Sequence, residues 1–338
     1  MVLDVLLALF GIAIAAVTLR DVFDTVIVPG TSHTTLHVAR RLVLLLLPIW
    51  KRIRGRRRAL SGNFAPIVLV SSFIIWMTLL MLGFAMVAYA LRSLFAPPLS
   101  SFGEAIYVVG SAIATIGEGE AVPHGLARGV VVASGLCGLA VMTMAVTYLL
   151  EVQDSIGRRD TGIMKLNTSA GEPPSALALL ERYAAIHNQG EIGDILREAR
   201  DWCATVRQSH SAHPSLIYFR TQRTGAGWPA ALGALLDLAL IAERCLADES
   251  LYGPGVLLRD DGVRVSTELA AMVRLPPRAL ETLEGDLREL TERLAKAGYA
   301  LRDGIDFAAF AEQRAQTQSA VTAMAEHLGQ PPAVLIRR

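Results

Sequence analysis

The sequence is poor in charged residues and in cysteine, and both shortages limit what the protein can be. Charged side chains make up 19% of the 338 residues, while hydrophobic residues reach 52%. An average soluble domain has about 25% charged residues. Three cysteines cannot make a disulfide framework, and they suit a reducing compartment. We therefore expect a chain that is embedded in part in a membrane.

Several functional classes lack their sequence signatures. The net charge of +1 gives no reason to expect nucleic acid as a partner. Neither a Gly-x-Gly-x-x-Gly motif after a strand nor a Walker loop is present, so nucleotide binding is unsupported. No paired nucleophile and base, and no set of metal ligands, stands out. We therefore predict neither an enzyme nor a resident cofactor.

Three runs with almost no charge are long enough to cross a bilayer, which takes about 20 residues. Val2 to Leu19 is interrupted only by Asp4, and it lacks the basic start of a secretory signal. We therefore expect residues 1–28 to hold a retained spanning helix. Phe64 to Leu91 and Gly129 to Leu150 contain no charge at all and predict two further spans.

Residues 29–63 contain no acidic residue but eight basic ones, at positions 40, 41, 51, 52, 54 and 56–58. The positive-inside rule places this segment in the cytoplasm. We therefore expect a protein of the plasma (inner) membrane with its N-terminus outside and its C-terminal part in the cytoplasm. The apolar run Leu42 to Trp50 contains Pro48 and is too short to span, so we expect it in the interface, with the basic segment 40–58 on anionic lipids. The arginines either only set the topology or belong to a slide helix that is coupled to gating.

The stretch between the last two spans has the pattern of a re-entrant pore loop. Its apolar part, Ala105 to Ala114, would be a helix of about 15 Å, half of the 30 Å or so that a span needs. Ser101 and Glu104 form a capping box at its start. Residues 115–120, Thr-Ile-Gly-Glu-Gly-Glu, follow directly. Irregular backbone of this kind is tolerated at membrane depth only where protein buries it or water lines it.

This motif resembles the selectivity filter of potassium-channel-type pores, usually written TVGYGD. The resemblance implies a homotetramer in which each chain supplies one pore loop. It also implies ion-binding backbone carbonyls, together with the Thr115 hydroxyl, in a filter made of Thr115, Ile116, Gly117, Glu118 and Gly119. Glycines suit a filter backbone that passes through left-handed conformations.

The motif departs from the family pattern at two positions. Glu118 replaces the tyrosine that packs behind the filter, and Glu120 replaces the aspartate at the pore mouth. The short helix offers only Tyr107 for the aromatic support that the resembling channels have. We therefore expect a cation channel that conducts K⁺ or, less selectively, Na⁺ or divalent cations.

The last span carries Gly135 and Gly138. In the resembling channels the equivalent helix lines the cavity and bends near a glycine to gate. A gate hinge and close helix packing both remain open for these glycines. Thr143 and Thr147 are candidates to line the inner cavity.

Beyond residue 153 the sequence is more polar. We interpret residues 154–174, which are rich in glycine and proline, as a linker. Residues 175–338 predict a mainly helical cytosolic domain, with a strand-like piece at 255–265. The apolar stretch Trp228 to Ala242 is interrupted by Asp237, which favours a buried bundle helix over a fourth span.

Together these patterns predict an all-α membrane protein. Its pore domain, residues 64–153, holds the filter at 115–120. The resemblance favours a tetrameric cation channel whose partners are copies of itself and the lipid bilayer. A non-conducting, membrane-anchored signalling or scaffold protein with a helical interaction domain is the alternative.

Overall fold

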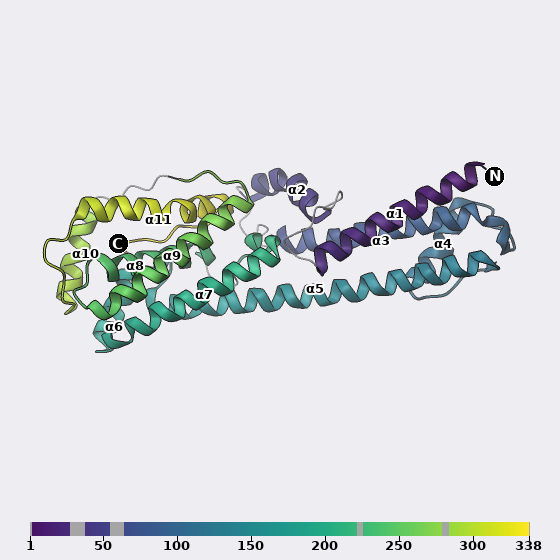
Figure 1. Ribbon diagram of the computed structural model, residues 1–338. Helices are drawn as coiled ribbons and strands as arrows, with labels where there is room; N and C mark the ends of the chain where they lie inside the picture. The colour runs from purple at the N-terminus through teal and green to yellow at the C-terminus, as the bar shows by residue number, and fades with distance from the viewer. Residues whose placement is uncertain (1, 28–37, 55–63, 222–225, 279–283, 338) are drawn as a thin grey trace. The chain divides into compact units, whose positions relative to one another are not determined.

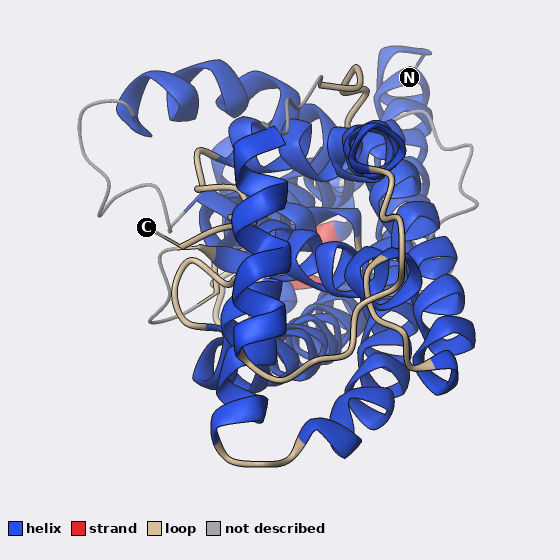
Figure 2. Cartoon of the chain, turned by 90° about the vertical axis from the view of Figure 1, so that its left-hand side faces the viewer, coloured by secondary structure: helices blue, strands red, loops and turns tan. Residues whose placement is uncertain are grey.

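The computed structural model describes residues 2–27, 38–54, 64–221, 226–278 and 284–337, which are almost entirely helical (Figure 2). The chain divides into two compact units, Met1–Val152 and Gln153–Arg338. Three helices of the described residues are long and apolar enough to cross a membrane: α1 (Val2–Val26), α3 (Phe64–Ala90) and α5 (Leu126–Ala170). The expected all-α membrane fold is confirmed.

A shorter apolar helix, α4 (Phe102–Ile113), lies in the chain between α3 and α5. Its 12 residues make about 18 Å of helix, which is too short to cross a bilayer of about 30 Å. The N-terminal unit therefore has the order expected of a pore-loop domain, which is span, short helix, loop and span. Helix α4 packs against α3 in this unit.

Helix α1 packs along α3 in the opposite direction (Figure 1). The two helices cross with their backbones in contact, because a Cβ on Gly11 would lie 2.4 Å from the Gly83 carbonyl oxygen. Small residues of this kind let membrane helices approach closely. At one end of the pair, an Arg92 guanidinium nitrogen lies 2.5 Å from the Asp4 carboxylate.

A buried carboxylate joins the pair towards its other end. Asp21 is 1% exposed, and its Oδ2 accepts a hydrogen bond of 2.8 Å from the Trp76 indole and one of 3.3 Å from the Val38 amide. Val38 is the first residue of α2 (Val38–Arg54), so Asp21 links three helices. Sequence reasoning assigned no contact to Asp21.

Helix α2 is longer than the expected apolar run and continues through Pro48. Trp50 is buried, and its ring lies 5.0 Å from that of Phe64, so within this unit it packs on protein. Of the basic segment 29–63, only residues 38–54 are described. Arg56, Arg57 and Arg58 lie outside the described residues.

The C-terminal unit is a helical bundle built around α8 (Gly227–Arg244), which is buried along almost its whole length. The other helices are α6 (Ala176–Ala185), α7 (Ile192–Ala212), α9 (Glu249–Met272), α10 (Glu284–Lys296) and α11 (Phe307–Leu328). Helices α9 and α11 pack directly on α8 (Figure 1). The expectation of a mainly helical domain agrees with this arrangement.

Asp237 of α8 is fully buried and is paired with Arg314 of α11. The guanidinium donates two hydrogen bonds to the carboxylate, at 2.7 and 2.9 Å. The Gln318 amide donates to the same carboxylate at 2.8 Å and to the Gly233 carbonyl at 2.7 Å. This network explains how an apolar helix carries an acidic residue inside the bundle.

The expectation of a strand at 255–265 is wrong, because these residues lie inside helix α9. The buried face of α9 includes Gly255 and Gly262, and hydropathy does not count glycine as apolar. A Cβ on Gly255 would lie 3.0 Å from the Ala239 carbonyl oxygen of α8. The two glycines therefore allow close packing of helices and do not mark a loop.

The interpretation of residues 154–174 as a linker also fails, since α5 continues to Ala170. Arg159 is 1% exposed and donates hydrogen bonds to the carbonyls of Leu216 and Phe219, at 3.1 and 3.0 Å. A Cβ on Gly162 would lie 2.2 Å from the Trp202 ring. These last turns of α5 are part of the core of the C-terminal unit.

Candidate ion pore

Two side chains, those of Ser101 and Glu104, cap the first turn of the short helix α4. The Ser101 hydroxyl accepts a hydrogen bond of 3.2 Å from the Glu104 amide, as the capping box predicts. The Glu104 carboxylate accepts one of 2.5 Å from the amide of Ser100, one residue earlier than the motif requires. These two hydrogen bonds fix where α4 begins.

The loop that follows α4 passes twice through the left-handed region of φ. Thr115 has φ of 60° and Gly117 has φ of 75°. Gly119 lies outside that region, so the expectation that both filter glycines supply left-handed conformations holds only for Gly117. A threonine in this conformation costs about 1–2 kcal/mol and is uncommon.

Ser111 of α4 holds the loop in this shape. Its carbonyl accepts hydrogen bonds from the amides of Ile116 and Gly117, at 2.8 and 3.2 Å. Its hydroxyl donates to the Glu118 carbonyl at 2.6 Å. Of the carbonyls expected to face ions, that of Glu118 is thus bonded to α4 of its own chain. Sequence reasoning missed Ser111, whose only signal is a hydroxyl in an otherwise apolar helix.

A short two-stranded clasp closes the loop at its far end. Strand β1 (Phe95–Ala96) pairs antiparallel with β2 (Val122–Pro123), and the His124 amide donates to the Leu94 carbonyl at 2.8 Å. The clasp joins the chain that leaves α3, through the short helix η2 (Arg92–Leu94), to the chain that enters α5. Both ends of the re-entrant segment are therefore held.

Acidic side chains surround a hollow of about 650 Å³ beside the loop, lined by Pro97, Val108, residues 117–121, Glu104 and Tyr107. The carboxylates of Glu118 and Glu120 are exposed. Tyr107 is 55% exposed in the single chain and lines the hollow, so it does not pack behind the loop of its own chain. A hollow with three carboxylates attracts cations.

The comparisons with known proteins agree with this geometry. A family model described as "Ion channel" matches residues 68–153, from the first turns of α3 through α4 and the loop into α5. Residues 68–153 form an ion-channel domain. No curated protein and no solved structure matches the chain. The match leaves out α1, α2 and most of the C-terminal unit.

Two glycines of α5 in the ion-channel domain, Gly135 and Gly138, lie against the end of α4. A Cβ on Gly138 would be 2.7 Å from the Ile113 carbonyl oxygen, and one on Gly135 would be 3.2 Å from that of Ala112. These distances favour close packing over a hinge at both positions. The glycines bring α5 directly behind the residues that lead into the loop.

Replacing Gly138 with alanine should displace the end of α4 and reduce ion flux through the ion-channel domain. The added methyl group would clash with the backbone carbonyl of Ile113, which cannot move aside as a flexible side chain could. Overpacking of this kind costs about 1–3 kcal/mol. Gly129→Ala is the matched control on the same helix, since a Cβ there meets no atom within 4 Å. Flux assays on both variants in liposomes test this, and equal flux would contradict the packing role.

Proposed function

We propose that the protein is a homotetrameric cation channel that conducts K⁺ or, less selectively, other cations through a backbone-carbonyl filter at residues 115–119. The observation that carries the proposal is the held loop after α4, with residues 114–120 exposed in the single chain. One such loop supplies only one wall of a pore. Four copies around an axis would close the filter and cover these residues.

The exposed face of α5 supports the assembly. Large apolar residues on this face are spaced four, three, seven and four residues apart, at Val132, Leu136, Leu139, Val146 and Leu150. A seven-residue repeat favours packing of a helix against another helix. Thr143 falls in the same series and is exposed, and its hydroxyl donates to the Leu139 carbonyl of its own helix at 2.9 Å. We infer that this face meets neighbouring copies and the ion pathway.

We propose the plasma (inner) membrane as the location, with the N-terminus outside and the C-terminal unit in the cytoplasm. The basic residues of segment 29–63 support this orientation. The opposite directions of α1 and α3 are consistent with this orientation, because α1 would cross from the outside to the cytoplasm and α3 would cross back. Anionic lipids would contact the basic segment 40–58.

Ion flux into liposomes by the purified full chain tests the proposal, with K⁺, Na⁺ and Ca²⁺ compared. In detergent, the expected mass of the protein is four times the 36.4 kDa of one chain. A stable monomer or dimer that carries no flux would overturn the channel. That result would favour the membrane-anchored signalling or scaffold alternative.

Substitutions at the two glutamates should change selectivity in different ways. Glu118→Tyr restores the residue that the resembling channels have, so the reversal potential should shift towards K⁺. The shift should be partial, since Tyr107 is the one aromatic residue that α4 offers near the loop, apart from Phe102 at its start, and it does not pack behind the loop of its own chain. Glu120→Gln should mainly weaken block by external divalent cations, because it removes charge at the mouth. Bi-ionic reversal potentials measure both effects, and strong K⁺ selectivity in the unmodified protein would contradict them.

A further inference from the structure

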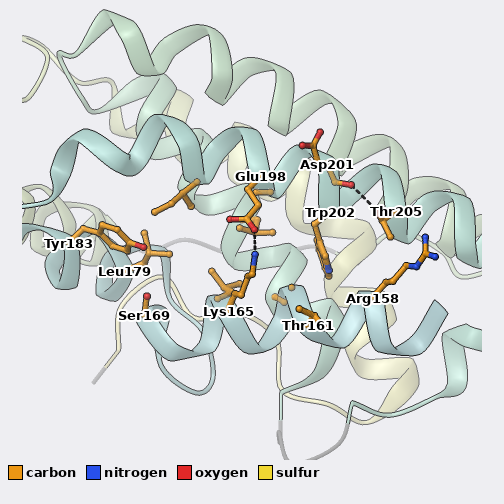
Figure 3. Close-up of a pocket in the computed structure, with 16 residues that line it drawn as sticks. Arg158, Thr161, Lys165, Ser169, Leu179, Tyr183, Glu198, Asp201, Trp202 and Thr205 are labelled. Atoms are coloured by element: carbon orange, nitrogen blue, oxygen red, sulfur yellow. Dashed lines mark hydrogen bonds and ion pairs between the residues drawn. The ribbon is translucent and has the colours of Figure 1, made fainter. Parts of the chain in front are cut away.

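The C-terminal unit contains a pocket that the ion-channel domain does not explain. It has a volume of about 400 Å³ and lies between the last turns of α5 and helices α6, α7 and α8 (Figure 3). This volume is in the range of small-molecule sites, which is about 300–1,000 Å³. Its apolar lining includes Leu166, Leu179, Trp202 and Leu235.

One cation and one carboxylate meet across this pocket. Lys165 of α5 and Glu198 of α7 form an ion pair that bridges the two helices (Figure 3). The Lys165 and Glu198 side chains are 64% and 60% exposed. Exposed ion pairs contribute little to stability, so a ligand can open this pair at small cost. Opening it presents a cation on one wall and a carboxylate on the other.

Trp202 supplies a fixed apolar surface next to the pair. Its indole N–H donates to the Arg159 carbonyl at 2.9 Å, so the polar atom of the ring is already bonded. Its ring edge lies against Gly162, where a Cβ would be 2.2 Å away. Trp202 is 9% exposed, so the ring offers the pocket a small aromatic surface held in one position, which suits an apolar or aromatic group.

The arrangement of charges selects the class of ligand. The lining carries two cations, Arg158 and Lys165, and two carboxylates, Glu198 and Asp201. Its charges are therefore balanced, which gives no advantage to a multiply charged anion such as a nucleotide. A ligand with one positive and one negative group satisfies both walls. Because Lys165 and Glu198 touch each other, the two ligand charges must also lie close together. The ammonium and carboxylate groups of a free α-amino acid, attached to one carbon, meet that condition.

We propose that this pocket binds a free α-amino acid with an apolar or aromatic side chain. Its carboxylate bonds to Lys165, its ammonium group bonds to Glu198, and its side chain packs on Trp202 and Leu235. Resting on the proposed channel function, binding regulates ion flux, because α5 carries both Lys165 and the exposed Thr143 and Thr147.

Calorimetric titration of the full chain in detergent tests the site. The probes are L-phenylalanine, 3-phenylpropionate, which lacks the ammonium group, and 2-phenylethylamine, which lacks the carboxylate. L-Phenylalanine should bind, and each single-charge analogue should bind at least about tenfold more weakly, since each loses a charge-assisted hydrogen bond. Lys165→Met and Glu198→Gln should each weaken L-phenylalanine binding by a similar factor.

A charge reversal provides the control for folding. Lys165→Glu combined with Glu198→Lys keeps the pair but exchanges the two contacts of the ligand. Because the α-carbon is chiral, the exchanged contacts with the side chain still on Trp202 fit D-phenylalanine, so this variant should bind D-phenylalanine better than L-phenylalanine. Equal binding of all three probes, no binding of L-phenylalanine, or full binding by both single variants would overturn the proposal.

Flux assays separate this site from the channel function. L-Phenylalanine should change K⁺ flux in liposomes with the unmodified protein and not with Lys165→Met. Binding without any flux would overturn the channel and leave the binding site in place. Flux in a protein that does not bind L-phenylalanine would overturn the site and leave the channel in place.

Discussion

Gly117→Val should abolish ion flux while the proposed tetramer still assembles. Gly117 has φ of 75°, where a β-branched side chain is a conformational outlier. The strain is about 1–2 kcal/mol in each chain, or about 4–8 kcal/mol over four chains. Since about 1.4 kcal/mol is a factor of ten, the correctly formed filter should become rarer by at least about a thousandfold.

The neighbouring glycine supplies a matched control for this strain. Gly119 lies outside the left-handed region, and a Cβ there would be 3.5 Å from a Val108 methyl group, which is an ordinary contact. Gly119→Ala should therefore keep most of the flux, whereas Gly117→Ala should lose much of it. K⁺ flux per assembled tetramer, with the mass measured in detergent, compares the variants. Full flux in a Gly117→Val tetramer would show that residues 115–119 are not the filter.

Arg314→Met should destabilise the C-terminal unit by about 3–5 kcal/mol, since it leaves the buried Asp237 without its cation. Burial alone would lower the pKa of Arg314, but the charge of Asp237 and its hydrogen bonds outweigh this and raise it. The guanidinium therefore stays charged inside the bundle. Hydrogen exchange in peptides from α8 and α11 of the full chain measures the loss.

Two further variants isolate the cause of that loss. Asp237→Leu combined with Arg314→Met removes both charges and should recover most of the stability, because Gln318 keeps its bond to the Gly233 carbonyl. Arg288→Met removes one half of an exposed pair with Glu284 and should cost about 1 kcal/mol or less. If Arg314→Met exchanged no faster than Arg288→Met, the buried pair would not be a main support of the bundle.

The sequence predicts the membrane part well because uncharged length is a strong signal. The three spans, the short helix and the Ser101 cap can all be found from charge, length and one motif. The shape of the loop is harder to predict, since the hydrogen bonds of Ser111 join residues five to seven positions apart without a repeating pattern. Asp21 escaped notice because its partner Trp76 lies in another helix.

Glycine explains the two largest errors in the C-terminal half. Gly162 was one of the residues that suggested a linker, because glycine commonly marks loops, and Gly255 interrupts the apolar periodicity of a helix at the start of the expected strand. In the structure each lies where a second helix leaves no room for a side chain. A single sequence cannot distinguish these two uses of glycine, because the neighbouring helix is distant in the chain.

The contact between α1 and α3 determines the smallest fragment that can serve as a complete membrane unit. A two-span fragment starting at residue 64 would expose the backbone beside Gly83 to acyl chains, which cannot follow that surface as closely as Gly11 does. It would also lose the ion pair between Arg92 and Asp4, which joins one end of α1 to the end of α3. A fragment intended to reproduce the native membrane part should therefore include α1, although the family match begins at residue 68.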